Sequence, residues 1–163
     1  MTKIKIKQID YANAEQAADL MMLLNAYAQD PMGGGKPLDG AVLSRLPKEL
    51  GQLPNAFSLI AYVDDKPAGL TNCFFGFSTF AAKKLVNIHD VTVLPTFRGM
   101  GLSKKMLATV EEIARENNCG KLTLEVLTGN RVAMNAYKKM GFKGYEVAEK
   151  SGFYLFWEKK LLA

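Results

Sequence analysis

Two periodicities of the apolar residues divide this chain into strands and helices. Short apolar runs and period-two alternation predict strands, whereas apolar residues that recur every three or four positions predict helices. The predicted strands cover residues 3–9, 56–63, 67–77, 85–93, 121–127, 142–147 and 152–160. The predicted helices cover residues 13–29, 39–51, 101–117 and 130–140, and the second is expected to be interrupted near Pro47. This order of elements, with one strand–helix–strand crossover, fits a mixed α+β sheet.

The composition is that of one globular domain. The chain has 163 residues, of which 48% are hydrophobic and 23% charged, so a single domain over residues 1–163 can bury a substantial core. No apolar run is long enough to span a bilayer, and the lysine–isoleucine alternation at the start does not resemble a secretory signal. Cys73 and Cys119 have neither metal-ligand spacing nor the pattern of a disulfide framework. We therefore expect a cytoplasmic protein without a bound metal.

The net charge of +5 does not alter the expectation of a single globular domain. Arg98, Lys104 and Lys105 lie near the start of the predicted helix 101–117, and Arg131 lies near the start of the predicted helix 130–140. All four could serve a small anionic ligand. The chain has no compact Lys/Arg run and no interleaved aromatic platform, so nothing in it indicates a nucleic-acid partner.

The most informative segment is Val93–Ser103, where a predicted strand passes into a helix through a basic turn that contains two glycines. The first N–H groups of a helix are unpaired and carry the positive end of the helix dipole. Gly99 and Gly101 let a ligand approach the backbone closely, and Arg98 adds a fixed positive charge. This combination suits a diphosphate. A dinucleotide-binding fingerprint is excluded because Lys104 occupies the position of its last glycine.

This turn resembles the coenzyme A pyrophosphate loop of the GNAT family of N-acetyltransferases. The family's pattern is Arg or Gln, two residues, Gly, one residue, and then Gly or Ala. Arg98 and Gly101 match it, whereas Ser103 departs from the last position with a small side chain that can donate to a phosphate. A second segment resembles the family's next motif position by position, through Leu122, Leu124, Val126, Asn130, Ala133, Tyr137, Gly141 and Phe142.

The resemblance implies a single-domain GNAT fold, a mostly antiparallel sheet of about seven strands flanked by helices. It also implies acetyl-CoA as cosubstrate and transfer of the acetyl group to an amine by direct attack. The cofactor-binding positions that it implies are Val91, Val93, Arg98, Gly99, Met100, Gly101, Leu102, Ser103, Asn130 and Tyr137. Tyr137 stands where the family's general acid often lies, and a phenol with an ordinary pKa of about 10 can donate a proton to the departing thiolate.

His89 and Asp90 compete for the role of the catalytic base. His89 is the only histidine, and imidazole exchanges protons near neutral pH. Asp90 is expected either to orient His89 or to bind a cationic amine. Strict alternation along a strand sends neighbouring side chains to opposite faces, so only one of them reaches the acetyl group unless a β-bulge intervenes.

The surroundings of these two residues resemble the spermidine/spermine and thialysine acetyltransferases, which have glutamate where His89 stands. We therefore expect a small primary amine as acceptor, diamine-like or amino-acid-like. Two alternatives stay open: a protein N-terminal or lysine acetyltransferase, and a non-catalytic acyl-coenzyme A-binding module. A homodimer is also expected, because the relatives form dimers and the segment 153–157 is apolar on both faces.

Overall fold

The computed structural model describes residues 2–145, 152 and 154–161. Their sheet has the strand order β1-β2-β3-β4-β5. The strands are β1 (Ile4–Gln8), β2 (Ala56–Val63), β3 (Lys66–Ser78), β4 (Lys83–Val93) and β5 (Lys121–Leu124). The first four strands are antiparallel to their neighbours, and β5 is parallel to β4. The parallel pair is possible because a helix connects β4 to β5 and provides the crossover.

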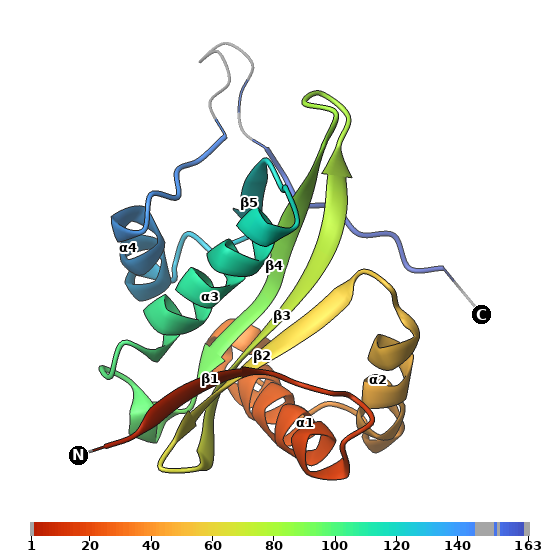
Figure 1. The fold of residues 1–163 in the computed structure, drawn as a ribbon, viewed down its shortest axis with the longest axis vertical. Coiled ribbons are helices and arrows are strands. Elements are labelled where there is room, and N and C mark those ends of the chain that lie inside the picture. The colour runs from red at the N-terminus through yellow and green to blue at the C-terminus, as the bar shows by residue number, and fades with distance from the viewer. Residues whose placement is uncertain (1, 146–151, 153, 162–163) are drawn as a thin grey trace.

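Helices cover both faces of this sheet (Figure 1). The helices are α1 (Ala14–Gln29), α2 (Gly40–Gln52), α3 (Leu102–Glu116) and α4 (Arg131–Lys139), with short 3₁₀ turns η1 (Pro31–Gly33) and η2 (Pro95–Phe97). Helices α1 and α2 lie on one face, and α3 and α4 lie on the other. No helix in the described part of the chain is both long and apolar enough to cross a membrane.

The core consists of an apolar layer on each face of the sheet. On the α1 face, Leu20 and Leu23 pack against Ile60 and Leu70, and all four side chains are fully buried. On the α3 face, a second cluster contains Val86, Ile88, Leu107 and Val110. Burying one such side chain contributes about 1.5–3 kcal/mol, so the two layers hold the sheet rigidly between the helices.

Two details of the predicted fold are wrong. The described sheet has five strands and not about seven, because residues 142–145, 152 and 154–160 form no strand. The remaining residues of the two predicted strands, 146–151 and 153, lie outside the described residues. An apolar run shows only that side chains can be buried, whereas a strand also needs a neighbouring edge to pair with. The predicted interruption at Pro47 is also absent, since buried Pro47 and Leu50 hold α2 continuous through tertiary packing.

Candidate active site

Strand β4 contains a β-bulge at His89. Ile88 pairs with Cys73 of β3 and Asp90 pairs with the preceding residue, Asn72, so His89 has no partner on β3. Because the extra residue cancels one step of the alternation, His89 and Asp90 lie on the same face of the sheet. The ring of His89 meets Phe74 edge-on with centroids 5.6 Å apart, and Asp90 accepts a hydrogen bond from Asn72. The bulge thus brings both candidate bases to the α1 face.

The same point on β4 marks the end of its pairing with β5. The last pair is Ile88 with Leu124, and among the described residues no strand pairs with that edge of β4 further on. A cavity of about 400 Å³ lies along the unpaired end of β4. It is lined by Tyr27, Asp30, Met32, Val91, Thr92, Val93, Phe97, Arg98, Gly99, Gly101, Leu102, Ser103, Asn130, Val132, Ala133, Ala136 and Tyr137.

The wall of the cavity formed by the start of α3 is mostly backbone. Gly99 and Gly101 have φ values of 83° and 72°, in the left-handed region that favours glycine, and a Cβ on either would meet no atom within 4 Å. Gly101 caps α3 without a side-chain hydrogen bond, and the first helical bond runs from the Lys105 N–H to its carbonyl. The N–H groups of Leu102 and Ser103 therefore have no partner inside the helix. This wall fits the diphosphate of coenzyme A.

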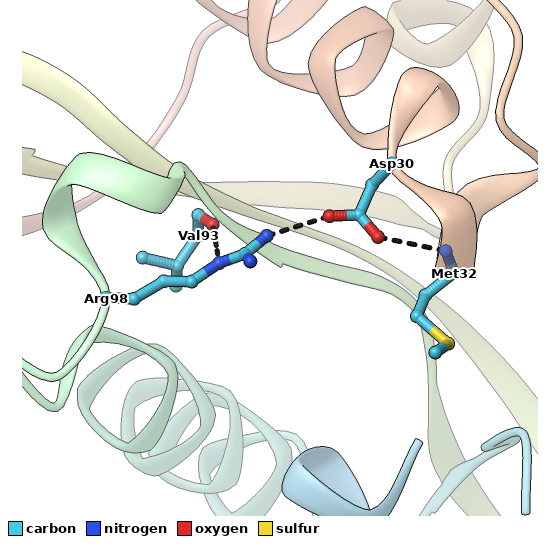
Figure 2. A network of polar contacts seen from close by, with 4 residues as sticks. All are labelled: Asp30, Met32, Val93 and Arg98. Atoms are coloured by element: carbon cyan, nitrogen blue, oxygen red, sulfur yellow. Dashed lines mark hydrogen bonds and ion pairs between the residues drawn. The ribbon is translucent and has the colours of Figure 1, made fainter. Parts of the chain in front are cut away.

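Arg98 is held by two contacts inside the protein (Figure 2). Its Nε donates to the carbonyl oxygen of Val93 at 3.1 Å, and its Nη2 donates to Oδ2 of Asp30 at 2.9 Å. Oδ1 of Asp30 accepts from the N–H of Met32 at 2.9 Å. This backbone donor, followed by the Arg98 hydrogen bond, lowers the pKa of Asp30 below its usual value. Arg98 therefore ties the turn after β4 to the end of α1, a contact that the motif does not reveal.

Tyr137 projects from α4 into the cavity. Its ring packs against Phe142 with centroids 5.9 Å apart, and it also lines a larger apolar cavity of about 650 Å³ between β5, α4 and residues 141–145. Burial, followed by the nearby phenol of Tyr27, raises the pKa of Tyr137 above its usual value of 10. The phenol is consequently protonated at neutral pH, as a proton donor must be.

Most of the predicted site residues converge on this cavity. Its lining contains Val91, Val93, Arg98, Gly99, Gly101, Leu102, Ser103, Asn130 and Tyr137. Asn130 also caps α4, since its side chain accepts from the N–H of Ala133 at 3.1 Å. Met100, His89 and Asp90 are not in the lining given by the described residues: Met100 packs against the core and His89 is exposed.

The sequence gives no signal for the part of the lining that comes from α1. In the sequence, Tyr27 lies on the same stripe of the helix as Leu20 and Leu23, and Asp30 follows the end of that helix. In the structure both line the cavity. Burial raises the pKa of Tyr27, and the carboxylates of Asp90 and Asp30 raise it further, so Tyr27 lies within electrostatic reach of both.

Comparison with known proteins agrees with this geometry. The model of the acetyltransferase (GNAT) family matches residues 21–142, which include the bulge, the glycine turn and Tyr137. The chain therefore belongs to the acetyltransferase (GNAT) family, and the predicted family is confirmed.

Individual relatives are amine acetyltransferases by name. Thialysine N-epsilon-acetyltransferase of Bos taurus is 32% identical over 83 residues, which cover 51% of this chain and 47% of the relative. Spermidine/spermine N(1)-acetyltransferase-like protein 1 of Homo sapiens is 26% identical over 162 residues, covering 95% of this chain and 23% of the relative. The chain thus spans about half the length or less of these curated relatives.

The fold is shared with a solved aminoglycoside N-acetyltransferase, AAC(6')-Iy in complex with CoA. The two structures agree with a TM-score of 0.75 at 17% identity, over 99% of this chain and 97% of the other. At this identity the likeness confirms the GNAT fold and says nothing of the substrate.

Proposed function

We propose that the protein is an N-acetyltransferase that moves the acetyl group of acetyl-CoA to the primary amine of a small molecule by direct attack. The observation that supports this most directly is the meeting of two elements in one cavity. The uncapped N-terminus of α3 and the protonated phenol of Tyr137 both line the space of about 400 Å³ beside β4. One element suits an anionic cosubstrate, and the other suits proton donation to a leaving group.

The cofactor side of the reaction uses backbone groups of the chain. Acetyl-CoA, when bound, supplies an activated acetyl thioester. The N–H groups at the start of α3 and the open backbone of Gly99 and Gly101 would hold its diphosphate. Beyond its last pair with β5, β4 at Val91 and Val93 would bind the pantetheine arm and polarise the thioester carbonyl, while the carbonyl oxygen of Val93 is held by Arg98. Tyr137 would protonate the sulfur as it leaves.

The acceptor side must remove a proton from the amine. A free alkylamine has a pKa of about 10, so it arrives protonated and cannot attack. We assign His89 as the group that takes this proton, and Asp90 as the carboxylate that attracts the cationic amine. The bulge supports this division, because it places both side chains on one face of the sheet. Tyr27, within electrostatic reach of Asp90 and in the cavity lining, would border the same space.

Turnover of acetyl-CoA with a panel of acceptors tests this function. The panel contains spermidine, thialysine, lysine, an aminoglycoside, and peptides with a free N-terminus or an internal lysine. Release of free thiol measures the rate, and mass spectrometry identifies the product. We expect turnover with a small amine. Turnover with peptides alone would show a protein acetyltransferase, and tight coenzyme A binding without turnover would show a non-catalytic module.

We further propose a homodimer. The described residues of the tail expose a cluster of large apolar side chains: Tyr154, Leu155, Phe156 and Trp157 are 69–84% exposed. Exposed apolar surface of this kind is typical of an interaction site. Light scattering at micromolar concentration should give the mass of a dimer, and a monomeric mass would contradict the proposal.

A further inference from the structure

Four polar side chains form a line across the α1 face of the sheet and end at Asp90. The hydroxyl of Tyr11 lies 2.8 Å from Oγ of Ser58 on β2. Ser58 Oγ donates to Oδ1 of Asn72 on β3 at 2.6 Å, and Nδ2 of Asn72 donates to Oδ2 of Asp90 on β4 at 2.9 Å. The line therefore crosses three neighbouring strands in register, since Ser58 pairs with Asn72 and Asn72 with Asp90.

The chemistry of the groups fixes the direction of every bond in this line. A carboxylate only accepts, so the amide nitrogen of Asn72 must face Asp90 and its oxygen must face Ser58. The single hydroxyl proton of Ser58 is then used on Asn72, which leaves Tyr11 as the donor to Ser58. Tyr11, Ser58 and Asn72 each donate to the next residue in the direction of Asp90. In a chain of hydrogen bonds aligned in this way, each bond polarises the next one.

The two middle residues of the line are buried and lie between apolar side chains of their own strands. Ser58 is 0% and Asn72 is 3% exposed, and their neighbours on this face are Ile60, Leu70 and Phe74. A buried hydrogen-bonded pair can often be replaced by apolar side chains of the same shape at little cost in stability, so stability alone does not require Ser58 and Asn72 here. Asn72 does more than satisfy Ser58, because it also donates to Asp90, the residue that follows the bulge.

We propose that Asn72, supported by Ser58 and Tyr11, is a positioning residue for Asp90 that fixes its carboxylate toward the acceptor amine. This inference rests on the proposed function. Only Oδ2 of Asp90 receives a hydrogen bond from the residues that the structure describes, so Oδ1 is available to an ammonium group. An amide donor on Oδ2 locks the rotation of the carboxylate and holds Oδ1 in one direction.

Substitution of Asn72 by leucine, which has a similar shape, tests the proposal. With the fastest amine of the panel, we expect kcat/KM for the amine to fall about tenfold to a hundredfold, the effect of losing one hydrogen bond to a charged group. The dissociation constant for acetyl-CoA, measured by calorimetry, should stay within about twofold of the wild-type value. Tyr62→Phe is the matched control, because Tyr62 donates to Asp19 at 2.8 Å on the same face without belonging to the line.

A second pair of variants keeps the test valid if Asn72→Leu does not fold. Ser58→Thr and Ser58→Val add the same bulk to the strand and differ only in the hydroxyl, so their common packing cost cancels. We expect the Thr variant to keep a several-fold higher kcat/KM for the amine than the Val variant. Equal values in two folded proteins would overturn the proposal.

A double-mutant cycle with Asp90→Ala separates positioning from general stabilisation. If Asn72 acts through Asp90, Asn72→Leu has little further effect once the carboxylate is gone. Additive losses would overturn the inference while leaving the proposed function intact. If no amine in the panel is acetylated by the wild-type protein, the proposed function fails first, and this inference fails with it.

Discussion

Two walls of the cavity, one at the start of α3 and one at the end of α1, are built in different ways. The wall at the start of α3 is formed by consecutive residues, two glycines with left-handed φ and a helix end without a side-chain cap. The second wall is formed by side chains from a distant part of the chain, Tyr27 and Asp30 at the end of α1. Backbone geometry of the first kind restricts which residues can occur, so it leaves a motif. Side chains that meet only through tertiary packing leave none.

This contrast predicts which substitutions affect chemistry and which affect binding. Variants of the local, backbone-built wall should change cosubstrate affinity. Variants on the other elements should change turnover or the arrangement of loops while the diphosphate site stays intact. The substitutions below are ordered by the size of the effect expected.

The largest effect is expected for Tyr137→Phe. The variant keeps the ring that packs against Phe142 and removes only the proton donor. We expect kcat to fall by roughly 10²–10⁴-fold, the usual contribution of a general acid, with coenzyme A affinity nearly unchanged. Because burial raises the pKa of Tyr137 above 10, donation should also persist in the wild-type enzyme through pH 9. If the chemical step limits the rate and the variant still has the wild-type kcat, Tyr137 is a packing residue and not the general acid.

The next effect is expected for Gly101→Val, which places a branched side chain over the start of α3. We expect coenzyme A affinity to fall about tenfold to a hundredfold, since the diphosphate loses charge-assisted bonds to N–H groups. Strain in the left-handed region adds a stability loss of about 1–2 kcal/mol. Gly141→Val is the matched control. Gly141 has a similar φ of 89° and equally open space around it, but it follows the C-terminal end of α4 and does not precede a helix. Equal coenzyme A affinities in the two variants would contradict the diphosphate site.

Arg98→Ala tests whether the motif arginine contacts the ligand or only ties two loops together. If it contacts the diphosphate, we expect coenzyme A affinity to fall about tenfold or more. Asp30→Asn breaks the ion pair and keeps the arginine, so it should then weaken affinity only a few-fold. Calorimetric titration of both variants gives the answer, and equal losses would show that Arg98 acts through Asp30 alone.

The smallest effect is expected for the pH dependence of stability at this ion pair. The Met32 N–H and Arg98 lower the pKa of Asp30, so its contribution is fully present above about pH 4. It is lost as the pH falls below that value and through the lowered pKa. Exposed ion pairs contribute about 0–1 kcal/mol, so the melting temperatures of the wild type and Asp30→Asn should differ slightly at pH 6, and the difference should shrink as the pH falls through the lowered pKa of Asp30. A difference that does not shrink as the pH is lowered would contradict this account.

The same contrast explains how much of the molecule its sequence predicts. The long helix after the glycine turn and the strands before it follow from local patterns, and the structure contains them. The bulge at His89 does not follow, because it depends on the register of a partner strand. The partner of Arg98 does not follow either, since Asp30 lies 68 residues earlier. The described residues of the two strands predicted after residue 141 form no strand for a related reason, because apolar content does not specify which edge a segment pairs with.

The bulge at His89 also determines how β4 tolerates a change in length. If His89 were deleted, Ile88 would still pair with Cys73 and Asp90 with Asn72, and no apolar side chain would change faces. The candidate base thus occupies the one position of the strand that the register of the β3–β4 pair does not require. In genetic terms, the histidine can be gained or lost through a single codon while the sheet around it keeps its pairing.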